Sequence, residues 1–172
     1  MTAVAPKAAL VTAFESQGTS AATFASPLTF GGRVRSIVSV TAVAAADSDL
    51  DIFHVTPVYS SWRIDRILAK CTAITLGSAY ECGLYQTSLF STAVVDIDVY
   101  AATQTFAVAI ATLPLDLVEQ VRALTTSAQA VWQDAAATAD TRRWYYLSYT
   151  ATTAGTAAGT ISTRVHYVDG GS

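Results

Sequence analysis

Short runs in which apolar residues alternate with polar ones recur along most of the chain. In RVRSIVSVTAVA, which begins at Arg33, the apolar residues on one face are Val34, Val38, Val40 and Ala42. A period of two residues is typical of a β-strand whose two faces meet different surroundings. The pattern therefore predicts a strand over residues 33–44, with these apolar residues on a single face.

Later runs rich in β-branched and aromatic residues are also predicted to be strands: DIFHVTPV, SSWRIDRILAKCTAI, AYECGLYQT, VVDIDVYA, RWYYLSYT and GTISTRVHYV. Pro57 ends its strand or places it at a sheet edge, because proline has no N–H to donate to a neighbouring strand. The odd spacing between Ile64 and Ile67 cannot keep both on one face of a regular strand. We therefore expect a bulge near Asp65.

One segment has a helical period instead. In LPLDLVEQVRAL, Pro114 stands in the first turn, and four apolar residues recur at the spacing of a helical stripe: Leu117, Val118, Val121 and Leu124. A second helical turn is predicted in AQAVWQDAAA, where it would seat Trp132.

These elements predict a mainly β chain that folds as an antiparallel β-sandwich, jelly-roll-like in topology, with one short helical insertion. A chain of 172 residues suits one domain with a sizeable core. Residues 1–30 are rich in Ala, Ser and Thr without a sustained period, which predicts an extended N-terminal arm. The β-sandwich domain is predicted over residues 31–172, beginning at Gly31 and Gly32, which allow a sharp bend.

The composition favours association with other protein surfaces. Hydrophobic residues make up 52% of the chain and charged residues 13%, about half of the usual charged share, so apolar contact surface is expected outside the core. The run RWYYLSYT is apolar on both faces, and its outer face needs a cover from the helix, the arm or a partner. The predicted partner-contact residues are Phe14, Phe24, Phe30, Trp144 and Tyr146.

Charge and hydropathy argue against nucleic-acid and membrane partners. Ten basic and thirteen acidic residues give a net charge of −3, without the cationic stripe that phosphate binding requires. The most apolar stretch, FAVAIATLPLDLV, is too short to cross a bilayer. The N-terminal sequence shows no convincing signal-peptide cleavage site, so we expect the chain in the cytoplasm or in a particle assembled there.

The acidic turn DSDLD begins like a calcium-binding loop. Asp47, Asp49 and Asp51 have the required spacing, but the sixth and twelfth positions hold Ile52 and Val58 where the loop needs Gly and Glu. We therefore interpret the segment as a solvated turn.

No other pattern predicts a metal, cofactor or catalytic site. His54 and His166 lie inside predicted strands and share no ligand pattern. Asp96 and Asp98 stand two residues apart on one strand face, as a glycosidase pair could, but solvent exposure of that face explains them at least as well. A nucleophile elbow is absent from the sequence, and the glycines of AGTAAGT do not join a strand to a helix as a phosphate-binding loop does. The chain is therefore not expected to be an enzyme.

The two cysteines, Cys71 and Cys82, lie on opposite sides of the turn signal TLGS. A hairpin folded about this turn would place them roughly opposite each other, where a cross-strand disulfide is conceivable. Two free, buried thiols in a reducing compartment are the favoured alternative.

Several segments follow one another in a particular order: GGRVRSIVSVT after an irregular arm, FHVTPVYSSWRIDRILAKCTAI, AYECGLYQT, VVDIDVYA, AVWQDA and the terminal AAGTISTRVHYV. In this pattern and order the chain resembles a group of small head proteins of tailed bacteriophages. The resemblance extends over about residues 31–168 and does not include the arm. Val58-Tyr59-Ser60-Ser61 stand where the group often has Pro-Ala-Gly-Ala, so the match is loose there.

The resemblance implies a virion structural protein, most plausibly a capsid cement or decoration protein that binds the major capsid protein on the outer surface of the capsid. It carries no catalytic residues with it. Symmetry of the shell also favours self-association as a dimer or trimer. Two other functions stay open: a carbohydrate- or receptor-binding module of a phage fibre or spike, with Trp62, Trp132 and Trp144 as a stacking platform, and another structural part of the head.

Overall fold

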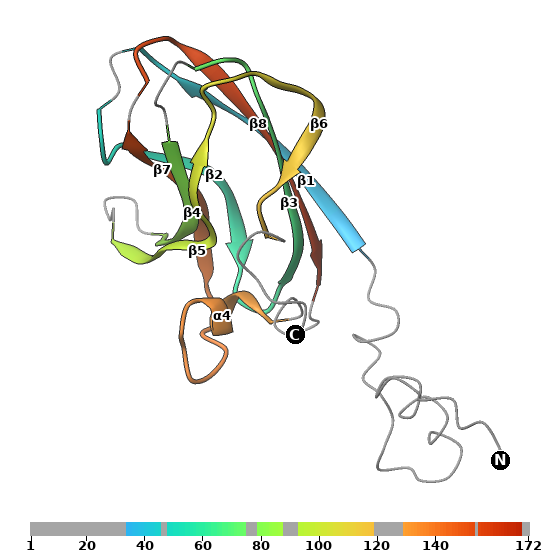
Figure 1. Ribbon diagram of the computed structural model, residues 1–172. Helices are drawn as coiled ribbons and strands as arrows, with labels where there is room; N and C mark the ends of the chain where they lie inside the picture. The colour runs from blue at the N-terminus through green and yellow to red at the C-terminus, as the bar shows by residue number, and fades with distance from the viewer. Residues whose placement is uncertain are drawn as a thin grey trace, which may run out of the picture. The chain divides into compact units, whose positions relative to one another are not determined.

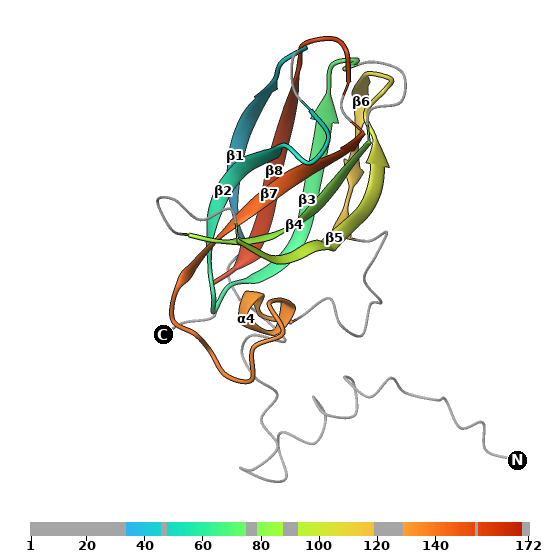
Figure 2. The same ribbon diagram turned by 90° about the vertical axis from the view of Figure 1, so that its left-hand side faces the viewer.

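The strands of this protein form two antiparallel sheets that pack face to face (Figures 1 and 2). The computed structural model describes residues 34–45, 48–74, 79–87, 93–118, 129–153 and 155–169. The elements within these ranges are β1 (Val34–Val43), β2 (Ile52–Tyr59), β3 (Arg63–Cys71), β4 (Ala79–Gln86), β5 (Val94–Thr105), β6 (Ile110–Asp116), α4 (Val131–Asp134), β7 (Trp144–Thr153) and β8 (Gly159–Val168). The predicted arm, residues 1–30, lies outside the described residues.

The order of the strands follows a simple rule. Sheet A has the order β1-β8-β3-β6, and sheet B has the order β2-β7-β4-β5. The first strand therefore pairs with the last, the second with the seventh, the third with the sixth and the fourth with the fifth, always antiparallel. This is the winding of a jelly roll, in which one long antiparallel hairpin is folded over into two sheets. The predicted β-sandwich is confirmed.

The hydrophobic core lies between the two sheets. Sheet A contributes branched aliphatic side chains, and sheet B contributes leucines and tyrosines; the most deeply buried include Ile64, Ile67, Ile161, Leu84, Leu147, Tyr80 and Tyr149. The hydroxyl groups of Tyr149 in β7 and Thr163 in β8 lie 2.9 Å apart and form a hydrogen bond inside this core. A polar link between the two sheets is thus satisfied where an unpaired hydroxyl would be costly.

Two local signals of the sequence are confirmed. The pairing of β3 with β8 shifts register between Ile64 and Arg66, at the predicted bulge, and both Ile64 and Ile67 are fully buried as a result. Pro57 lies in β2, which is an edge strand of sheet B.

The long predicted helix is wrong over its first turn. Residues 113–116 belong to β6, where Leu115 pairs with Ala69 and Asp116 with Leu68. Pro114 is accommodated there because β6, like β1, is an edge strand of sheet A. One side of β6 therefore needs no partner strand to accept its N–H groups. The rest of the predicted helical stripe, beyond Val118, lies outside the described residues.

The second predicted helical turn is present as α4. It is anchored by the turn between β2 and β3, since Val131 N–H donates to the Trp62 carbonyl (2.8 Å) and Trp132 N–H to the Ser60 carbonyl (3.0 Å). Tyr100 of β5 donates to Asp134 at the other end of α4 (2.8 Å). These tertiary contacts matter because so short a helix is not stable by itself.

The predicted hairpin around the cysteines does not form. Cys71 ends β3 in sheet A, whereas Cys82 lies in β4 of sheet B, so the chain crosses between the sheets at this point. Both thiols are free and buried. Burial raises the pKa of each thiol, which disfavours the reactive thiolate. Among the described residues, no helix is long and apolar enough to span a membrane.

The close pairing of β4 with β5 depends on Gly83. Leu84 pairs with Asp96 and Cys82 with Ala101, so residues 97–100 of β5 form a bulge opposite Gly83 alone. A Cβ atom at Gly83 would lie 2.1 Å from the Asp96 carbonyl oxygen and 2.4 Å from the Ile97 carbonyl carbon. Neither is a side-chain atom that can rotate away, so only glycine fits here.

We therefore expect Gly83→Ala to lower the free energy of unfolding by ~3 kcal/mol, the upper end for overpacking, because β5 must move. Urea unfolding followed by circular dichroism measures this loss. Gly159→Ala is the matched control: its added Cβ would meet the Thr72 Oγ1 at 2.7 Å and the Ile74 Cγ1 at 3.0 Å, and both are side-chain atoms that can adjust. Equal losses in the two variants would contradict this account.

Candidate interaction surfaces

The outer face of sheet A exposes apolar side chains that the sequence pattern had marked. Val34, Val38 and Val40 of β1 are 55%, 61% and 63% exposed. The opposite face of β1 is directed inward, and there the Ser39 hydroxyl donates to the Val55 carbonyl of β2 (2.8 Å). The predicted apolar face of this strand therefore faces solvent, while the opposite face, which carries Ile37, Ser39 and the core residue Val43, is turned to sheet B.

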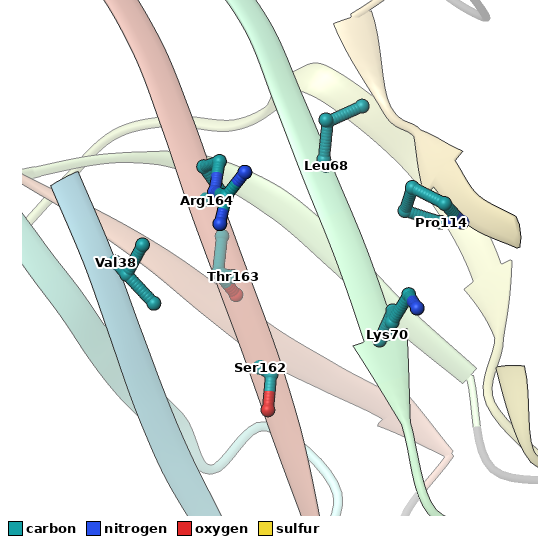
Figure 3. Close-up of a pocket in the computed structure, with 7 residues that line it drawn as sticks. All are labelled: Val38, Leu68, Lys70, Pro114, Ser162, Thr163 and Arg164. Atoms are coloured by element: carbon teal, nitrogen blue, oxygen red, sulfur yellow. The ribbon is translucent and has the colours of Figure 1, made fainter. Parts of the chain in front are cut away.

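A shallow groove of about 360 Å³ crosses this outer face. Figure 3 shows its walls, which come from all four strands of sheet A: Val38, Leu68, Lys70, Pro114, Ser162, Thr163 and Arg164. Val38 and Leu68 lie on either side of Arg164, because each is its direct partner in a neighbouring strand. The groove thus combines apolar walls with two cationic side chains.

Cations outnumber anions on this face. The Lys70 ammonium donates to the Ala111 carbonyl (2.9 Å), and the Arg66 guanidinium lies 3.7 Å from the Asp116 carboxylate. Arg164 is exposed, and within the described part of the chain it has no ion-pair partner. A partner carboxylate placed over the groove would find two positive groups next to apolar walls.

The outer face of sheet B has a different character. Tyr146, a predicted contact residue in β7, stacks on His54 of β2 with ring centroids 4.6 Å apart. The His54 Nδ1 lies 2.8 Å from the Ser148 hydroxyl, within hydrogen-bonding distance, and Tyr85 meets the imidazole edge-on. Burial lowers the pKa of His54, which favours the neutral imidazole. Tyr146 is therefore half-covered within its own chain.

Trp144, the other predicted contact residue described, is 45% exposed at the start of β7. Its neighbours Tyr59 and Trp62 meet it edge-on, at interplanar angles of 64° and 83°. Trp62 in turn stacks on Tyr167, with centroids 4.0 Å apart. Among the residues that the structure describes, no coplanar neighbour extends the exposed ring of Trp144, whereas a flat sugar-stacking platform would need one.

A group of carboxylates lies on the edge of sheet B. Glu81 of β4 and Asp96 of β5 both have a raised pKa, caused first by burial and then, for Glu81, by the charge of Asp98. Asp98 is exposed and Val94 on the same strand is 50% exposed. Within the described residues, none of these carboxylates forms a salt bridge. The β5 edge therefore presents negative charge and apolar surface together.

A metal site among the described residues would need several His, Cys, Asp or Glu side chains close together. No group of three or more His, Cys, Asp and Glu side chains that could hold a metal ion occurs there. His54 and His166 lie in different sheets. In the acidic turn, the Asp51 carboxylate accepts a hydrogen bond from the Ser48 N–H (2.7 Å), as in an ordinary turn, and Asp47 lies outside the described residues.

The structure describes two of the predicted contact residues, Trp144 and Tyr146, and their contact role stays a prediction. Phe14, Phe24 and Phe30 lie outside the described residues, so their contact role stays a prediction. Sequence reasoning missed the groove on sheet A. The alternation in β1 was the available signal, but it does not say which face of a strand is turned to solvent.

The fold is similar to that of a solved chain in the capsid of Ralstonia phage GP4. The two chains share 13% sequence identity with a TM-score of 0.59, and the similarity covers 82% of this chain and 87% of the other. No protein-family model matches the sequence, and no curated protein matches it either. At this level of identity, the comparison establishes a common fold.

We expect Trp62→Ala to lower the free energy of unfolding by ~3 kcal/mol, because it removes a ring stacked on Tyr167 and in contact with Trp144. Trp144→Ala, at a half-exposed ring, is expected to cost ~1 kcal/mol. Denaturant unfolding of the two variants measures both values. A larger loss for Trp144→Ala would show that the exposed ring is the structural anchor.

We expect Asp98→Asn to lower the pKa of Glu81, because one cause of its raised value is the negative charge of Asp98. A carboxyl group with a raised pKa in the folded state favours folding at low pH, and this contribution is lost as pH rises through the folded pKa. The variant should therefore gain a little stability at pH 7 and none at about pH 3, below the ordinary Glu pKa.

An NMR titration of the Glu81 carboxyl, with thermal unfolding at both pH values, measures the two effects. Asp65→Asn, which changes an exposed carboxylate outside this group, serves as the control. If both variants left the pKa of Glu81 unchanged, burial would be its sole cause.

Proposed function

We propose that this protein is a structural component of a bacteriophage virion, specifically a cement or decoration protein that binds and stabilises the lattice of the major capsid protein. The observation that carries the proposal is the fold, which is shared over most of its length with a chain of a phage capsid. The order of segments along the sequence supports the same assignment independently, because it resembles that of small phage head proteins.

The surfaces described above suit such a role. Apolar side chains are exposed in rows on sheet A, and an exposed apolar face of this kind is typical of a protein contact. A cement protein gains stability from many weak contacts that act together, and a rigid sandwich can offer several at once. In this proposal, the N-terminal arm adds a further contact through Phe14, Phe24 and Phe30, while Trp144 and Tyr146 contribute from the sandwich.

The proposed position is the outer surface of the capsid, after assembly in the host cytoplasm. A net charge of −3 supports an outer position, because a protein that faces packaged DNA would more often be basic. Self-association as a closed, symmetric oligomer accompanies this role, since the shell presents its binding sites around symmetry axes. The proposed role involves no bond-making step, and no nucleic acid or membrane as partner.

Expanded capsid shells that lack this protein provide the test. We expect the purified chain to bind shells of its own phage saturably and to raise their melting temperature, because binding to the assembled lattice stabilises it by mass action. Substituting Phe14, Phe24 and Phe30 together by Ala should weaken binding about tenfold or more, because buried aromatic anchors dominate protein interfaces. Co-sedimentation and calorimetry measure the two quantities.

Val108→Ala, which shortens an exposed apolar side chain in the loop between β5 and β6, is the matched control and should bind normally. Shells that neither bind the chain nor melt later in its presence would refute the proposal. Saturable binding to a glycan in place of shells would instead favour a receptor-binding module.

A further inference from the structure

The two broad faces of the sandwich carry opposite charge, although the net charge of the chain is small. On sheet A, Lys70 and Arg164 line the groove (Figure 3), and Arg66 lies in β3 of the same sheet. On sheet B, Glu81, Asp96 and Asp98 form the group on β4 and β5. Within the described residues, the ion pair of Arg66 with Asp116 brings a carboxylate to sheet A, and Asp65 at the bulge of β3 is a second carboxylate in that sheet.

The apolar residues of these two surfaces also match. The groove on sheet A has Val38, Leu68 and Pro114 in its walls. The β5 edge offers Val94, which is 50% exposed and comes directly before the half-buried Val95. An edge strand that carries both carboxylates and valines is the kind of element that a groove with cationic and apolar walls can accept.

We propose that the groove on the outer face of sheet A binds the β5 edge of sheet B in a second copy of this chain, with Arg164 and Lys70 facing Asp98 and Asp96. This inference deepens the self-association in the proposed function by naming the two surfaces. Charge complementarity is the reason for choosing a second copy: the chain itself supplies both the cationic groove and the acidic, apolar strand that would fill it.

The symmetry of the assembly follows from where these surfaces lie. They belong to opposite sheets of the sandwich, so a contact between them joins two different patches and is heterologous. Such a contact cannot form a two-fold dimer in which both copies are fully satisfied. Such a contact forms a ring of three or more copies, with every groove and every β5 edge occupied, if the rotation between neighbours closes, and an open filament if it does not. The closed, symmetric oligomer of the proposed function selects the ring.

Solution self-association of the full chain tests the contact without any capsid present. We expect sedimentation velocity and light scattering to show a closed oligomer of at least three copies, and raising the salt concentration from 0.05 to ~1 M to weaken it at least fivefold, because salt screens exposed charge pairs. A monomer at all concentrations up to ~0.1 mM, or an assembly that saturates at two copies, would overturn the proposal.

Charge reversal locates the contact. Arg164→Glu and Asp98→Arg should each raise the dissociation constant about tenfold or more, because each places like charges opposite one another. The double variant, with both reversals in one chain, should recover to within about threefold of the unaltered protein, as a coupled pair does in a double-mutant cycle. Arg142→Glu, in the loop before β7, is the matched control and should leave the assembly unchanged.

Both reversed residues are exposed, and circular dichroism melting of each variant shows whether the fold is retained. Unchanged self-association in folded Arg164→Glu or Asp98→Arg would overturn the proposed contact. The same variants are then added to capsid shells. If Arg164→Glu abolished shell binding but left self-association intact, the groove would serve the shell, and this inference would fail while the proposed function stood.

Discussion

Burial of one face of each sheet against the other is the interaction on which this structure depends. Each strand has two faces, and the jelly-roll pairing requires that all strands of a sheet turn the same face inward. The interior is dominated by branched aliphatic residues on one side and by tyrosines and leucines on the other. Tyrosine at such positions needs a partner for its hydroxyl, and the bond between Tyr149 and Thr163 supplies one across the core.

The demands of the core explain why apolar side chains appear on the outside. In β8, the residues that face the core are Ile161, Val165 and Tyr167, and the register with β8 fixes which face of β1 can turn the same way. As a result Val38 and Val40 are directed to solvent, while Ser39 faces sheet B and bonds to it. A row of exposed valines on an edge strand is a risk for aggregation unless another surface covers it. The exposed row is a surface that the proposed assembly role would cover.

The separation of charge between the two faces is a second consequence of the fold. A formal charge of −3 suggests a nearly neutral protein with no charged surface of its own. Once strands far apart in the sequence lie side by side, Lys70 and Arg164 are gathered on sheet A, while Glu81 and Asp98 are gathered on sheet B. Electrostatic fields depend on such local arrangements far more than on the total charge. A rigid sandwich with two unlike faces can direct association in one orientation.

The sequence by itself determined the elements whose signals are local. Runs of alternating or β-branched residues located the described strands except β6, and the odd spacing of Ile64 and Ile67 located the bulge, because both signals depend on a few neighbouring residues. It also indicated the fold class, since many short strands with little helix leave few ways to build a core. Residues 113–116 were misassigned as helix at this level, because pairing with β3 overrides a helical spacing.

Only the tertiary structure decided which face of β1 meets solvent, which cations share a groove, and that the two cysteines lie in different sheets. Each of these depends on pairing between strands that are many residues apart, such as β1 with β8. The pattern within one strand is the same whichever of its faces is buried, so only its neighbours can make that choice.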